Sequence, residues 1–161
     1  MDFTIRTAQP DDIELLKEAL YISVVWDADR PSTLEQVVGH PELLQYWENW
    51  GRPGDLGVIA ERDGRYLGAA FGRLFTEDRP SYGFVDEQTP EVGIGIIAGE
   101  RGKGLGRQMM LRLEDLYRES GCKQLSLSVN FTNPARHLYE SLGYTEVGHD
   151  ENSTQMVKEL R

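Results

Sequence analysis

The feature that most constrains the fold is a glycine-rich turn between a short apolar strand and an amphipathic helix. Gly102, Gly104 and Gly106 stand at alternate positions in this turn. Glycine carries no side chain and tolerates positive φ, so the backbone N–H groups of such a turn can point into one concavity. The helix N-terminus behind the turn adds the positive end of a dipole. The pattern predicts an anion site, most naturally one for a diphosphate.

Two common nucleotide-binding motifs do not fit this turn. The P-loop requires a Gly-Lys-Ser/Thr triplet, which the segment lacks. The dinucleotide fingerprint G-x-G-x-x-G fails because Arg107 stands where its third glycine should be. The alternative is an ordinary flexible connection between strand and helix, but such a connection requires neither three glycines nor the adjacent basic residues Arg101 and Lys103.

The pattern of apolar residues along the chain predicts an α/β domain with a mixed sheet. Strands are expected at 3–6, 56–62, 65–75, 92–97, 125–129, 144–149 and 154–159, and helices at 12–25, 104–119 and 134–142. Asp63-Gly64 predicts a tight hairpin turn between the second and third strands. Asp11 or Asp12 is expected to cap the first helix. Residues 76–90 read as a long, acidic, turn-rich loop.

Length and composition exclude several classes of protein. A length of 161 residues suits one domain, expected to span 1–161, and the net charge of -10 argues against nucleic-acid binding. No apolar run is long enough for a membrane span, and the N-terminus does not resemble a secretory signal. Cys122 is the single cysteine, and the three histidines are not spaced as metal ligands. These observations predict a cytoplasmic protein without a metal site.

A second informative segment runs from Asn133 to Tyr144. It predicts a short helix with Asn133 as N-cap, Pro134 at the first helical position and Gly143 as its C-terminal stop. On this reading alone, Asn133 is only a cap and Tyr139 is only a core residue.

Together these two segments resemble the GNAT superfamily of acetyl-CoA-dependent N-acyltransferases. Residues 101–106, Arg-Gly-Lys-Gly-Leu-Gly, match the family signature R/Q-x-x-G-x-G/A, and residues 133–144 are similar to N-x-A-x-x-L-Y-x-x-x-G-F/Y. Two departures are present: Ala98 stands where many members have proline, and many members have one more residue between the Asn and the Tyr. The resemblance implies a three-layer α/β/α domain whose central sheet is mixed and mostly antiparallel.

The resemblance also implies how acetyl-CoA, the co-substrate, would be held. The turn's backbone amides would bind the pyrophosphate, the main chain of the preceding strand would pair with the pantetheine arm, and the Asn would contact pantetheine. The residues implied to bind the cofactor are Ile94, Ile96, Ala98, Arg101, Gly102, Lys103, Gly104, Leu105, Gly106, Arg107 and Asn133.

The implied reaction is direct transfer of an acetyl group to an amine with both substrates bound. It requires a base for the amine, donors for the oxyanion and a proton for the departing thiolate. We expect Glu91 as base and Tyr139 as acid, with backbone N–H groups near Ile96 meeting the oxyanion. Glu91 could equally be a solvated strand-end carboxylate, in which case Asp86 and Glu87 are its competitors.

The acceptor is expected to be a primary amine of a small molecule or peptide, and five carboxylates favour a cationic one: Asp78, Asp86, Glu87, Asp150 and Glu151. The aromatic-rich part of residues 26–53 would be core or, in part, the wall of the acceptor pocket. Because dimers are frequent in the family, a homodimer is among the expected partners. Two alternatives stay open: a regulatory acyl-CoA-binding domain, and an acyltransferase with another acyl donor.

Overall fold

A seven-stranded sheet forms the centre of the protein. The computed structural model describes residues 2–25 and 33–161, and the strand order in this part of the chain is β1-β2-β3-β4-β5-β7-β6. The strands are β1 (Thr4–Thr7), β2 (Leu56–Arg62), β3 (Arg65–Arg73), β4 (Glu91–Ile96), β5 (Gln124–Asn130), β6 (Thr145–His149) and β7 (Ser153–Glu159). Only β4 and β5 pair in parallel among these neighbours; the other described pairs are antiparallel. The predicted mixed, mostly antiparallel sheet is confirmed.

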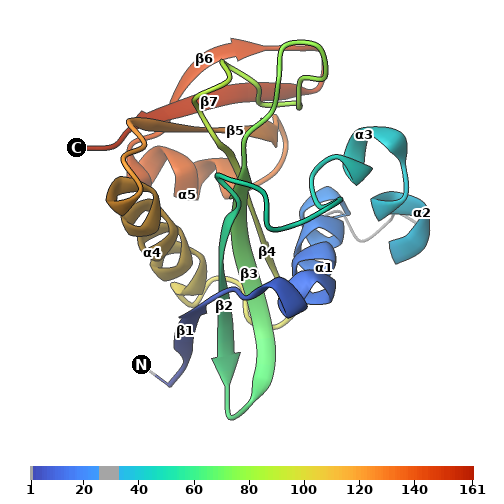
Figure 1. The fold of residues 1–161 in the computed structure, drawn as a ribbon. Helices are drawn as coiled ribbons and strands as arrows, with labels where there is room; N and C mark the ends of the chain where they lie inside the picture. The colour runs from blue at the N-terminus through green and yellow to red at the C-terminus, as the bar shows by residue number, and fades with distance from the viewer. Residues whose placement is uncertain (1, 26–32) are drawn as a thin grey trace.

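Helices cover both faces of the sheet, which gives the three layers expected. The helical elements are η1 (Pro10–Asp12), α1 (Ile13–Val24), α2 (Leu34–Val38), α3 (Pro41–Leu44), α4 (Leu105–Glu119) and α5 (Ala135–Leu142). In Figure 1, α1, α2 and α3 lie on one side of the sheet and α4 lies on the other. Each face has its own core, because alternate residues of a strand point to opposite faces. On β2, Val58 packs in the α4 core and Ile59 in the α1 core.

Most of the predicted elements are found within two residues of their expected ends. The Asp63-Gly64 hairpin is confirmed, with φ of 52° at Asp63 and 77° at Gly64. Helix α4 is amphipathic, as expected, and buries apolar residues that include Met109 and Leu113. Residues 26–32, part of the segment expected to shape an acceptor pocket, lie outside the described residues. No helix in the described ranges combines the length and apolar character that a bilayer crossing requires.

Asp12 is the N-cap residue of α1, as predicted, whereas the N-cap of α5 was predicted one residue too early. Asp12 makes no capping bond to α1, because its carboxylate accepts hydrogen bonds from the Arg6 guanidinium at 2.8 and 2.9 Å and from the Gln9 N–H at 2.7 Å. Helix α5 begins at Ala135, one residue later than expected, with Pro134 as its N-cap. Asn133 still satisfies one free donor of that helix end, because its Oδ1 accepts from the Ala135 N–H at 2.9 Å.

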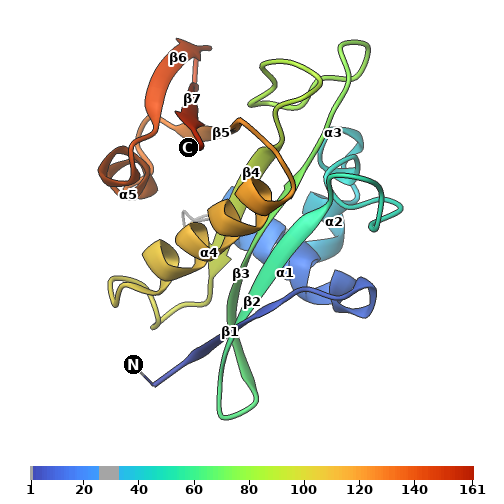
Figure 2. The same cartoon turned by 60° about the vertical axis from the view of Figure 1, so that its left-hand side comes forward.

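The sheet splits between β4 and β5. The two strands pair only at Glu91 and Ser126, close to one end. Beyond that pair they diverge, and Figure 2 shows β5, β7 and β6 standing apart from the first four strands. The split leaves one edge of β4 without a strand neighbour in the described chain. The glycine turn follows β4 directly, so the split and the turn belong to the same region of the molecule.

Candidate active site

A cavity of about 890 Å³ occupies the split. Most of its lining residues fall into two groups according to the elements that supply them, and Ser128, Val129 and Asn130 of β5 add to the wall. The glycine-turn half is formed by Ile94, Ile96, Arg101, Gly102, Gly104, Gly106, Arg107, Asn133, Pro134, Ala135, Leu138 and Tyr139. The aromatic half is formed by Leu20, Ser23, Val24, Leu43, Tyr46, Phe71, Tyr82 and Glu91. Strand β4 lies between the halves and contributes to both.

The open edge of β4 presents backbone groups to the cavity. Ile97, just after the strand, donates its N–H to the Leu67 carbonyl on β3 at 2.9 Å. Because backbone groups alternate in direction along a strand, those of Ile94 and Ile96 point to the opposite edge, where β5 has diverged. Among the residues that the structure describes, the Ile96 carbonyl accepts only a long hydrogen bond from Arg101 Nε, at 3.4 Å. The strand can therefore take an extended, amide-containing ligand as an added neighbour.

The glycine turn carries a row of unpaired backbone donors. Gly102 and Gly104 adopt φ of 76° and 83°, and the space where a side chain would stand is open at both. Within residues 2–25 and 33–161, no protein acceptor takes the backbone N–H groups of residues 101–107. Gly104 is also the N-cap of α4, so these donors coincide with the positive end of that helix. An anion is the ligand that this arrangement favours.

Gly106 has a different structural role from the other two glycines of the turn. A Cβ there would lie 3.2 Å from side-chain carbons of both Ile96 and Leu138. Its absence lets α4 approach β4 and α5 closely. Ala98, Lys103 and Leu105, which the resemblance implied would contact the cofactor, are not among the described residues that line the cavity, whereas the other eight implied cofactor residues are. Contact of these three residues with the cofactor stays a prediction, and it would have to be made by their backbone groups.

Tyr139 lies in the cavity wall on α5 and is 7 % exposed. Its ring packs edge-on against Tyr144, with 6.0 Å between ring centroids. Tyr144 is fixed in turn by a hydrogen bond from its hydroxyl to the buried carboxylate of Glu114 at 3.0 Å. No acceptor or donor in the described chain bonds the Tyr139 hydroxyl, and burial raises its pKa above the ordinary range. The hydroxyl is thus protonated at neutral pH and available to a ligand.

Glu91 does not face solvent, so it is not the solvated strand-end carboxylate that the sequence also allowed. It is 7 % exposed and lines the aromatic half of the cavity. Its Oε2 accepts a hydrogen bond from the Tyr46 hydroxyl at 2.8 Å, and its Oε1 accepts one from the Gly83 N–H at 2.7 Å. Burial raises the Glu91 pKa above its ordinary value, although contacts from Ser81, Tyr46 and Gly83 oppose the rise. A carboxylate with a raised pKa holds a proton more strongly than an exposed one, which suits a general base.

The other carboxylates expected near the acceptor are engaged elsewhere. Asp86 accepts bonds from the Gln88 N–H and the Thr89 hydroxyl, and Asp150 accepts bonds from two N–H groups of its own turn. Glu87 accepts from the Glu77 N–H within the loop. Of the described residues that line the cavity, Glu91 is the only carboxylate. Asp78, Asp86, Glu87, Asp150 and Glu151 are therefore not part of that lining.

Sequence reasoning did not single out Tyr46 and Tyr82. Both line the aromatic half, with nearly parallel rings 6.5 Å apart. The signal was the aromatic run around α3, but that run does not say which members face the cavity. Trp47 instead bonds the Val38 carbonyl, and Trp50 lies beneath the Arg73 guanidinium. Only the fold shows which of these aromatic residues face the cavity and which pack elsewhere.

Comparison with known proteins identifies the family. Residues 22–144 match the model of the acetyltransferase (GNAT) family. The chain belongs to this family. The match covers more than half of the sequence and includes both motifs and the whole of β4. By that membership the protein is an acetyltransferase.

Individual relatives agree with this assignment. The chain is 31% identical over 159 residues to a streptothricin acetyltransferase from Streptomyces lavendulae, covering 92% of this chain and 84% of the relative. It is 28% identical over 148 residues to the L-amino acid N-acyltransferase MnaT of Escherichia coli K12, covering 88% and 78%. Among solved structures, yncA from Salmonella typhimurium with its cofactor acetyl-CoA has a TM-score of 0.67 at 23% identity, covering 100% and 95%. That last likeness shows the GNAT fold.

Proposed function

We propose that this GNAT protein transfers the acetyl group of acetyl-CoA to a primary amine of a small molecule or peptide, with both substrates bound at once. The observation that carries the proposal is that the unpaired edge of β4 leads into a glycine turn whose backbone N–H groups have no acceptor among the described residues. A diphosphate fits the turn, and an amide-containing pantetheine arm fits the strand edge. Tyr139 and Glu91 then stand in the same cavity as the ligand.

The residues on the glycine-turn side would bind and orient the donor. The N–H groups of Gly102 to Arg107 would donate to the diphosphate, and Arg101 and Arg107 would add charge at the cavity wall. The backbone of Ile94 and Ile96 would pair with the pantetheine amides. The Ile96 N–H points toward this edge and would also meet the oxygen that becomes negative during transfer.

The chemical step would depend on two side chains of the cavity, Glu91 and Tyr139. Glu91 would accept the proton that the amine loses, directly or through water, while the amine nitrogen forms a bond to the thioester carbonyl carbon. The tetrahedral species would then break its C–S bond, and Tyr139 would give its proton to the departing sulfur. The high pKa of Tyr139 keeps that proton in place until the thiolate forms. No covalent bond to the protein is required.

The acceptor half supports a cationic amine. A single buried carboxylate beside the aromatic rings of Tyr46, Phe71 and Tyr82 suits one ammonium group attached to an apolar body. The relatives named above point the same way, since one is named for streptothricin and the other for L-amino acids. The cavity and these relatives both support an acetyltransferase that acts on an amine.

Calorimetry with acetyl-CoA, followed by thiol release against a panel of amines, tests this proposal. The panel contains L-methionine, spermidine, kanamycin, phenethylamine and an alanine-terminated peptide. We expect micromolar binding of acetyl-CoA and acetylation of at least one amine. Absence of acetyl-CoA binding would overturn the proposal. Binding with no transfer to any amine would favour a regulatory acyl-CoA-binding domain instead, and transfer only from a longer acyl-CoA would change the donor.

A further inference from the structure

Tyr46 and Glu91 are far apart in sequence and in contact in the structure. Tyr46 follows α3, whereas Glu91 opens β4, and each is 7 % exposed. Their bond of 2.8 Å joins the Tyr46 hydroxyl to Glu91 Oε2 inside the cavity wall. Nothing in the sequence motifs that identify the family includes Tyr46.

The Tyr46 hydroxyl takes part in two hydrogen bonds. The Tyr46 oxygen accepts the N–H of Tyr82 at 3.0 Å. An ionised carboxylate can only accept, so the Tyr46 hydroxyl donates its proton to Glu91 while its oxygen accepts the Tyr82 N–H. Glu91 Oε1 accepts from the Gly83 N–H at 2.7 Å. Among the described residues, each carboxylate oxygen thus has one donor at hydrogen-bond geometry, with the Ser81 hydroxyl nearby, and a lone pair is left for an amine or a water.

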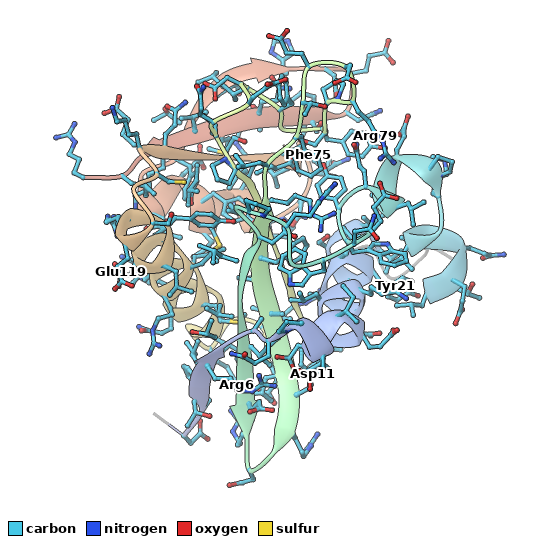
Figure 3. All side chains as sticks on the ribbon, viewed as in Figure 1. Arg6, Asp11, Tyr21, Phe75, Arg79 and Glu119 are labelled. Carbon is cyan, nitrogen blue, oxygen red and sulfur yellow. The ribbon has the colours of Figure 1, made fainter. Side chains whose placement is uncertain are left out.

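The Tyr46 ring is held rigidly in place. It packs against Phe75, with 5.0 Å between centroids, and lies nearly parallel to the ring of Tyr82. Figure 3 shows Phe75 near the top of the sheet, on the side that carries the loop after β3. A donor that is fixed on both its ring and its oxygen loses little freedom when it bonds the carboxylate.

The Ser81 and Tyr46 hydroxyl groups both lower the pKa of Glu91, but among the described residues only the Tyr46 hydroxyl meets hydrogen-bond geometry to the carboxylate. Arg73 stands opposite Glu91 in the β3–β4 register, but its guanidinium is bound by both oxygens of Asp55 and by two backbone carbonyls. The Tyr82 hydroxyl bonds Glu42 and not Glu91. From β5, the residue opposite Glu91 is Ser126, which carries no charge.

We propose that Tyr46 is a positioning residue, which keeps Glu91 ionised and correctly oriented to take a proton from the acceptor amine. This inference rests on the proposed role of Glu91 as base. A donated hydrogen bond stabilises the carboxylate over the carboxylic acid, so it opposes the effect of burial. Tyr46 itself remains a donor, because its own burial and the charge of Glu91 both raise its pKa. Loss of the hydroxyl would leave the buried carboxyl group protonated over a wider range of pH.

The sign of the pH effect follows directly. Glu91 acts as a base only when ionised, so activity is lost as pH falls through its pKa. Tyr46→Phe removes a donor to the ionised form, which raises that pKa and moves the acid limb of the rate profile to higher pH. We expect a shift of about one pH unit, the size typical of a hydrogen bond to a charged group.

The shift can be measured without knowing the acceptor. The side-chain carboxyl of Glu91 is followed by ¹³C NMR as pH is varied, and Glu91→Gln assigns its signal by difference. Tyr46→Phe should raise the midpoint by about one unit. Tyr82→Phe is the matched control, because it removes a phenol from the same wall but leaves the backbone N–H and the Glu91 bond in place. Its midpoint should equal that of the unmodified protein.

Kinetics with acetyl-CoA and the best amine of the panel complete the test. The acid limb for kcat should move by the same amount in Tyr46→Phe, while the acetyl-CoA Kd stays unchanged and shows that the fold is intact. An unmoved midpoint, or a moved midpoint with an unmoved acid limb, would overturn the positioning role. Full turnover in Glu91→Gln would instead remove Glu91 as the base, which is a failure of the proposed function.

Discussion

The glycine-turn half of the cavity comes from two short stretches of sequence, 94–107 and 133–139, whereas the aromatic half is gathered from α1, the α3 region, β3, the loop 76–90 and the start of β4. The first half acts mainly through backbone N–H and C=O groups whose direction is set by local geometry. The second acts through side chains that meet only when distant segments pack. The difference suggests that donor binding and acceptor chemistry can be perturbed separately.

The largest expected effect is on the aromatic side. Glu91→Gln keeps the shape of the residue and removes the base, so kcat should fall by about 10³-fold. The Kd for acetyl-CoA should not change, because the turn and the β4 edge are untouched. Steady-state thiol release and calorimetry measure the two quantities. A parallel loss of acetyl-CoA affinity would mean that the two halves are not separable.

Tyr139→Phe should lower kcat by about 10²-fold. The hydroxyl has no partner among the described residues and the ring keeps its contact with Tyr144, so stability should be nearly unchanged. Thermal unfolding checks the fold, and rapid-quench measurement of product formation checks the chemical step. A fully active Tyr139→Phe enzyme would show that the thiolate leaves without a proton from this residue.

The glycine-turn side is tested by two matched substitutions at the ends of α4. Gly104 and Gly121 both have positive φ, 83° and 91°, and both face open space. Alanine at either position should cost roughly 1–3 kcal/mol of backbone strain. Only Gly104→Ala also places a methyl group in the concavity and turns its amides, so only it should weaken acetyl-CoA binding, by about tenfold.

Equal affinities in the two alanine variants would contradict the diphosphate site. Melting temperatures of both should fall together, which separates the general strain from the specific loss of binding.

The smallest effect is expected from a single exposed charge. Arg101→Gln should weaken acetyl-CoA binding about threefold at low salt, and less as salt screens the interaction. Arg65→Gln, at the exposed tip of the β2–β3 hairpin, removes the same charge far from the cavity lining. Calorimetry at two salt concentrations compares them. Equal effects of the two substitutions would assign the loss to net charge alone.

The sequence predicted those parts of the site whose residues lie close together along the chain, and it missed contacts between distant segments. The turn and the α5 motif were readable because glycines, basic residues and a helix stop lie within a few positions of one another. Glu91 was predicted as the base and lines the cavity, but its environment was not predicted, since Tyr46 and Gly83 reach it from other segments. The acidic loop residues misled, because carboxylates in turns commonly bond nearby N–H groups, as Asp86 and Asp150 do.

The sequence by itself determined the elements, the glycine turn that begins α4 and the family to which the chain belongs. Each of these depends on residues close together along the chain, where backbone geometry and side-chain spacing are directly coupled. Only the tertiary structure decided that β4 parts from β5 after one residue pair, that Tyr46 rather than Trp47 or Trp50 faces the cavity, and that Glu91 is buried. Those outcomes depend on packing between distant segments, and no local pattern encodes that packing.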